Sequence, residues 1–169
     1  MHPQLHVSLP PLPLATRRTR PTGLVAGTLV QTDSGDLPVE YLLAGDRVLT
    51  RNGAVDLRGT SVLEAVDAEV VVIEPAALPA GAASVPLVLP VSQQVLVRDW
   101  RAMILHGQDE MLTPAASLVD DLLVRRETRA RLRLIQLHFD APQVLRAGGM
   151  DVASARTRAP LAGHSRWLH

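Results

Sequence analysis

From Thr22 onward, short runs of apolar and mostly β-branched residues alternate with turn residues. This pattern is typical of an all-β domain built from many short strands. We therefore expect one mostly β domain over residues 22–154. The expected strands are Thr28–Thr32, Arg47–Thr50, Glu69–Ile73, Val85–Leu89, Gln94–Val97 and Arg133–Phe139.

Turn and helix signals lie between these runs. Asp33-Ser34-Gly35-Asp36 and Asn52-Gly53 predict tight hairpin turns, because glycine and asparagine tolerate positive φ. One short helix of about two turns is predicted over Ala115–Asp121, with Thr113 as N-cap and Pro114 at the first helical position. Neither heptads nor long internal repeats occur, which excludes coiled-coil and solenoid folds.

The two ends of the chain differ from this central part. Residues 1–21 hold five prolines and the basic residues Arg17, Arg18 and Arg20. That composition predicts a disordered Pro/Arg-rich arm, and the alternative is an arm that docks on an acidic partner. Residues 155–169 are expected to form a loose C-terminal tail.

Composition limits the function classes. The chain has 17 basic and 17 acidic residues, so no overall field draws it to nucleic acid or to an anionic membrane. Cysteine is absent, which excludes disulfides, thiolate metal sites and cysteine nucleophiles. We expect no cofactor.

The apolar runs are all far shorter than the roughly 20 residues of a membrane-spanning helix. At the N-terminus, apolar residues precede the arginines, the reverse of a signal peptide. We therefore expect a soluble protein without membrane contact or an N-terminal signal peptide, cytoplasmic by default.

Three polar features of the sequence bear on binding. The basic run Arg125–Arg133 reads as a solvated loop leading into a strand, and the scarcity of aromatic residues argues against a nucleic-acid site. The six histidines lack ligand spacing, so we expect no metal site.

Strand alternation places Gln136, His138 and Asp140 on one face. They form either a solvated outer face or a polar pair in a cleft, where Asp140 would raise the proton affinity of His138.

One set of residues carries a family resemblance. Gly27–Thr32, Gly35, Pro38–Glu40, Leu43 and Gly45–Thr50 read, in one register, G-T-x-(apolar)-x-T, a glycine turn, P-V-E and L-x-x-G-D-x-V-x-T. This resembles the opening of bacterial Hint (Hedgehog/intein) domains. Later blocks match in order and spacing: Val95–Ala102, Asp109–Leu112, Pro114-Ala115, Leu118-Val119, Leu137–Asp140 and Val144–Gly149. The resemblance covers about residues 22–154 and implies a compact, curved β fold.

The resemblance also implies a chemistry, autocatalytic peptide-bond rearrangement. A Cys or Ser before the Gly-Thr attacks the preceding carbonyl, and here that position is Gly23. A histidine in T/S-x-x-H protonates the leaving nitrogen, and here the block ends in Gln93. Two further histidines that flank Asp140 in relatives correspond to Gln136 and Pro142. Glycine has no nucleophile and glutamine exchanges no proton at physiological pH.

We therefore expect a Hint-like domain that has lost autoprocessing and acts as a binding or scaffold module with an unknown protein partner. The alternative is weak self-cleavage through Thr22, which with Ser92 supplies the hydroxyls beside the lost positions. A third interpretation is an arginine-rich surface for nucleic acid on a carrier fold. The sequence leaves the oligomeric state open.

Overall fold

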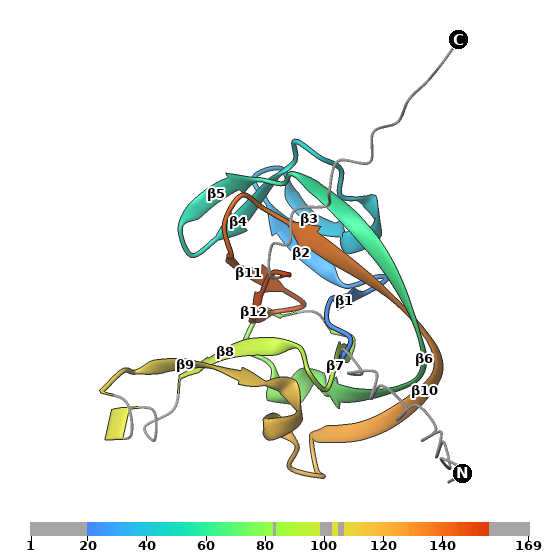
Figure 1. Ribbon diagram of the computed structural model, residues 1–169. Helices are drawn as coiled ribbons and strands as arrows, with labels where there is room; N and C mark the ends of the chain where they lie inside the picture. The colour runs from blue at the N-terminus through green and yellow to red at the C-terminus, as the bar shows by residue number, and fades with distance from the viewer. Residues whose placement is uncertain (1–19, 83, 99–102, 105–106, 156–169) are drawn as a thin grey trace, which may run out of the picture.

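The computed structural model describes residues 20–82, 84–98, 103–104 and 107–155, and these form two antiparallel sheets (Figure 1). The terminal segments 1–19 and 156–169, which contain most of the expected arm and tail, lie outside the described residues. In chain order the elements are β1 (Leu24–Val25), β2 (Leu29–Thr32), β3 (Gly35–Pro38), η1 (Val39–Tyr41), β4 (Arg47–Thr50), β5 (Gly53–Asp56), β6 (Gly59–Ile73), η2 (Pro75–Ala77), β7 (Leu87–Pro90), β8 (Gln94–Arg98), β9 (Glu110–Pro114), η3 (Ala115–Leu118), β10 (Val124–His138), β11 (Val144–Ala147) and β12 (Met150–Ala153).

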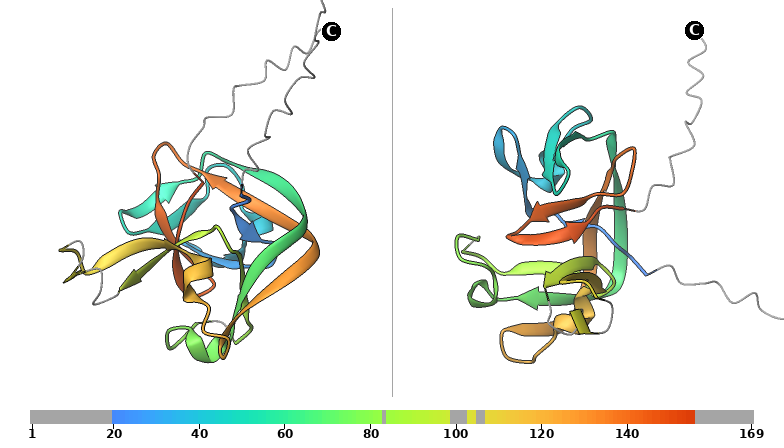
Figure 2. Two further views of the ribbon diagram at one scale, coloured as in Figure 1. Left: turned by 60° about the horizontal axis from the view of Figure 1, so that its bottom comes forward. Right: turned by 90° about the vertical axis from the view of Figure 1, so that its left-hand side faces the viewer.

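The smaller sheet has the strand order β1-β10-β6-β7. Its centre is a ribbon of two 15-residue strands, β6 and β10, which pair from Ile73 with Val124 to Gly59 with His138 and curve around one side of the molecule (Figure 1). The larger sheet has the order β3-β2-β4-β11-β12-β8-β9, and β5 pairs with β4. Figure 2 shows β11 and β12 between the β2–β5 hairpins and the β7–β9 region.

The core lies between the sheets and follows the alternation of the strands. Ile135, Leu137 and Phe139 of the β10 segment are buried in the main cluster, together with Val30, Val48 and Leu145 of the larger sheet. A smaller cluster on the other side of the ribbon holds Leu134 and its neighbours. Because Leu134 and Ile135 are buried on opposite faces of β10, this part of the strand is a fixed support for the segment that packs against it.

The mostly β class and the curved fold are confirmed, and so are the two hairpin turns. Gly35 and Gly53 follow two-residue turns with φ of 112° and 90°. The two turns share one local arrangement, because Thr32 and Thr50 each donate their hydroxyl to the carbonyl of the following turn glycine, at 2.6 and 2.8 Å.

The helix expected over Ala115–Asp121 is wrong, since the segment forms only the short 3-10 turn η3. The backbone becomes extended at Val119. Just beyond it, the carboxylate of Asp120 accepts hydrogen bonds from the N–H groups of Leu122, Leu123 and Val124. This local side-chain turn competes with helical bonding and directs the chain into β10.

The loop expected over Arg125–Arg133 is also wrong, because the whole run lies within β10. Its exposed arginines pair with nearby acids: Arg125 with Glu74, directly after β6, at 3.0 Å, and Arg129 with Glu127 of β10 at 2.9 Å. Charged side chains on a solvated strand face do not interrupt a ladder that is held by backbone hydrogen bonds. No helix among the described residues is long and apolar enough to cross a membrane.

Candidate functional site

Three segments that are distant in sequence converge where the N-terminal segment enters the fold. Thr22 and Gly23 directly precede β1, which pairs with β10 through Leu24 and Ile135. That pairing places Gly23 beside Gln136 of β10. The turn between β7 and β8 brings Gln93 to the same place.

Both polar groups of the Thr22–Gly23 peptide bond are held by glutamine side chains. The N–H of Gly23 donates to Oε1 of Gln93 at 2.9 Å, and Nε2 of Gln136 donates to the carbonyl oxygen of Thr22 at 3.0 Å. We call this arrangement the amide clamp. It holds the Thr22–Gly23 peptide bond with two groups that neither gain nor lose a proton at physiological pH.

The carboxamide of Gln93 is held in one orientation by its surroundings. Its side chain is buried, with 3% exposed, and its Nε2 donates to the carbonyl oxygens of Ala153 at 2.8 Å and Gln94 at 3.1 Å. Because both amide protons are engaged, the carboxamide oxygen has to face Gly23. Gln93 therefore ties the N-terminal segment to β12 and to the start of β8.

The site leaves little room for a side chain at Gly23. Its φ is +135°, which L side chains rarely adopt. A Cβ atom there would lie 3.0 Å from the Ile135 carbonyl oxygen, 3.2 Å from Cγ of Gln136 and 3.3 Å from Cβ of Leu134. Both the backbone conformation and the close neighbours therefore disfavour any side chain at position 23.

A hydroxyl lies one peptide unit upstream. Oγ of Ser92 donates to the carbonyl oxygen of Pro21 at 2.5 Å. The pattern of the sequence identifies Ser92 only as a neighbour of a lost motif position, and its contact with Pro21 could not be found without the fold. Together with the clamp, this contact engages three of the four polar groups of the Pro21–Thr22 and Thr22–Gly23 peptide bonds.

His138 and Asp140, expected as neighbours on one strand face, bind different partners. Nε2 of His138 lies 2.7 Å from Oγ of Ser61, which also lies 3.2 Å from Oε1 of Gln136. Asp140 is exposed and its carboxylate accepts hydrogen bonds from Nε and Nη2 of Arg58, the latter at 2.6 Å. The hydrogen bond from Arg58 lowers the pKa of Asp140 and raises that of Arg58.

Within the described ranges, no group of three or more His, Asp or Glu side chains is placed to hold a metal ion.

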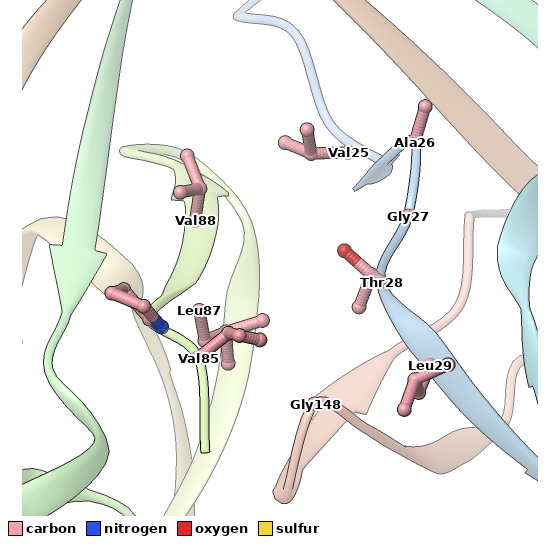
Figure 3. Close-up of a pocket in the computed structure, with 10 residues that line it drawn as sticks. Val25, Ala26, Gly27, Thr28, Leu29, Val85, Leu87, Val88 and Gly148 are labelled. Atoms are coloured by element: carbon pink, nitrogen blue, oxygen red, sulfur yellow. The ribbon is translucent and has the colours of Figure 1, made fainter. Parts of the chain in front are cut away.

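An apolar cleft of about 230 Å³ lies between the β1–β2 segment and β7 (Figure 3). Its lining carries no charged residue: Val25, Ala26, Gly27, Thr28, Leu29, Val85, Pro86, Leu87, Val88 and Gly148.

A family model of the Hint domain matches residues 22–159. This chain belongs to the Hint domain family. Solved structures with the same fold include a glutathione-linked, splice-inactive variant of the AceL NrdHF class 3 split intein, with 14% identity and a TM-score of 0.53, covering 81% of this chain and 100% of that one. A variant of the MchDnaB-1 intein has 14% identity and a TM-score of 0.50, covering 79% of this Hint domain and 99% of the intein. No curated protein sequence matches significantly.

Proposed function

We propose that this Hint domain has lost autoprocessing and acts as a binding or scaffold module. The amide clamp is the observation that carries the proposal. Rearrangement of the Thr22–Gly23 bond requires a nucleophile on residue 23 and an acid that protonates the departing nitrogen. Gly23 supplies no nucleophile, and its N–H donates a hydrogen bond to the carboxamide oxygen of Gln93, which has no proton to give.

The clamp also gives the lost site a structural role. It anchors the N-terminal segment to β8, β10 and β12 through neutral hydrogen bonds. The anchored segment then forms one wall of the apolar cleft, whose lining begins at Val25. An uncharged cleft selects an uncharged, apolar surface on a partner. The cleft is therefore the surface that we assign to binding.

The test is the intact mass of the purified protein with a removable N-terminal fusion, after a day at neutral pH with and without hydroxylamine or a thiol. We expect a single unchanged mass under all conditions. A product beginning at Gly23 would contradict the proposal, because it would show that the clamped bond is still broken.

A second candidate function rests on the Ser92–Pro21 contact. A hydroxyl that donates to the Pro21 carbonyl polarises it, and the hydroxyl of Thr22 is the adjacent nucleophile, so weak self-cleavage would break the Pro21–Thr22 bond. In the same mass experiment this function would give a product beginning at Thr22. Thr22→Val would abolish that product and Ser92→Ala would reduce it. If cleavage persisted in Thr22→Val, this candidate would be eliminated.

A further inference from the structure

A serine and a histidine outside the amide clamp form a close pair on the β6–β10 ribbon. Ser61 of β6 lies opposite Gln136 of β10, and Gly59 lies opposite His138, so Ser61 and His138 are diagonal neighbours on one face. Their Oγ and Nε2 atoms are 2.7 Å apart. This is the distance required of a hydroxyl nucleophile and its general base.

Two groups lie within hydrogen-bond distance of the Ser61 hydroxyl. Gln136 turns its Nε2 toward Thr22, so its Oε1 faces Ser61 at 3.2 Å and can only accept. Nε2 of His138 lies closer, at 2.7 Å, and accepts or donates according to the tautomer of the ring. In the tautomer that carries its proton on Nδ1, Nε2 accepts the Ser61 proton and can act as its general base.

The imidazole is half-buried and makes no second hydrogen bond to any residue that the structure describes. Its Nδ1 is buried and lacks a partner in the part of the chain that the structure describes. Ser61, in contrast, is exposed, so a reagent can approach its oxygen from solvent. Asp140, the nearest acid in sequence, is bound to Arg58 and does not orient the ring.

We propose that Ser61 is a nucleophile activated by His138 and that it accepts an acyl group from an activated ester or thioester. Oγ of Ser61 attacks the acyl carbonyl while its proton passes to Nε2 of His138. The intermediate then expels the alcohol or thiol, which takes that proton, and an ester on Ser61 remains. Because no third group among the described residues orients the imidazole for the hydrolysis that would release the acyl group, we expect one acylation per molecule rather than turnover. This site is independent of whether the domain processes its own chain.

The first test uses p-nitrophenyl acetate as the acyl donor and peptide mass spectrometry of the full chain. One acetyl group on Ser61 is expected, with loss of this label in Ser61→Ala. His138→Gln keeps a polar side chain of similar reach and should slow acetylation at least about tenfold, the lower range of general-base effects. Ser34→Ala is the matched control, because Ser34 is an exposed hydroxyl that contacts Asp33 and no histidine. Equal labelling of Ser34 and Ser61 would overturn the proposal.

A second test does not depend on how well His138→Gln folds. The chain has no cysteine, so Ser61→Cys introduces a single thiol. A neighbouring imidazole favours the thiolate, and alkylation by iodoacetamide at neutral pH should then be several-fold faster than in Ser34→Cys. The double variant Ser61→Cys with His138→Gln should lose that advantage. Equal rates for the two single thiols would show that His138 does not activate position 61.

Discussion

The amide clamp and the cluster around Glu110 perform the same structural task with different chemistry. Each ties together segments that are far apart in sequence. The clamp joins Gly23 to Gln93 and Thr22 to Gln136 through neutral, part-buried hydrogen bonds. Glu110 joins Arg51 and Arg98, each at 2.7 Å, through exposed ion pairs.

The difference lies in what each tie requires. The clamp depends on steric fit, since a buried amide without its partner loses the full hydrogen bond and is not compensated by water. The Glu110 cluster tolerates loose geometry, because opposite charges attract over a distance, but solvent and salt weaken that attraction. A substitution in the clamp should therefore affect stability strongly and independently of salt, and one in the cluster weakly and in a salt-dependent way.

The largest effect is expected for Gly23→Ala. The new Cβ would be 3.0 Å from a backbone carbonyl in a conformation with φ of +135°, and such strain costs about 1–3 kcal/mol or more. Urea unfolding should show a clearly lower midpoint. Gly59→Ala is the matched control, because a Cβ there meets nothing within 4 Å. Similar midpoints for the two variants would mean that the segment before β1 is not held as tightly as the clamp implies.

Gln93→Leu should follow. Leucine fills a similar volume but leaves the N–H of Gly23 and the carbonyl of Ala153 without the partners they have now, and we expect a loss of about 1–3 kcal/mol. Gln94→Leu tests the same change one residue further, at a side chain with no hydrogen bond to the described residues. The loss should be equal at low and high salt. A strong salt dependence would mean that charge interactions, and not the amide hydrogen bonds, stabilise this site.

The smallest effect is expected for Glu110→Gln. Hydrogen bonds from Arg51, and then from Arg98, lower the pKa of Glu110 in the folded protein. Its stabilising contribution is therefore complete above the pKa of the unfolded chain and is lost as the pH falls through the lowered folded pKa. Unfolding midpoints of the wild type and Glu110→Gln should differ slightly near neutral pH at low salt. They should converge in acid and at high salt, and a constant gap would contradict the ion-pair account.

The sequence predicts the parts of this fold that have local causes. Gly35 and Gly53 predict the two hairpins, because the residue after each two-residue turn adopts positive φ. The two long strands are predicted only in part: the expected Glu69–Ile73 and Arg133–Phe139 are the ends of β6 and β10 where burial is greatest. The remainder of these strands carries charges on a solvated ribbon, where alternation of apolar and polar residues is weak.

The same limit applies to the site. Gly23 and Gln93 can be singled out from the sequence because its resemblance to Hint domains aligns them with motif positions. Their hydrogen bond spans 70 positions and that of Gln136 with Thr22 spans 114. No local pattern reports such contacts. Ser61 stands in a run without any motif, so only the pairing of β6 with β10 reveals that it touches His138.

The strand β1, which lies at the edge of the smaller sheet and pairs with β10, affects how the chain folds. Leu24 is near the start of the domain, but its partner Ile135 is near the end. During synthesis, β1 therefore cannot pair with β10 until nearly the whole domain has left the ribosome. Contacts between such distant segments incur a large loop-closure entropy and slow folding. The N-terminal segment should thus be among the last parts of the domain to dock, after the local hairpins have formed.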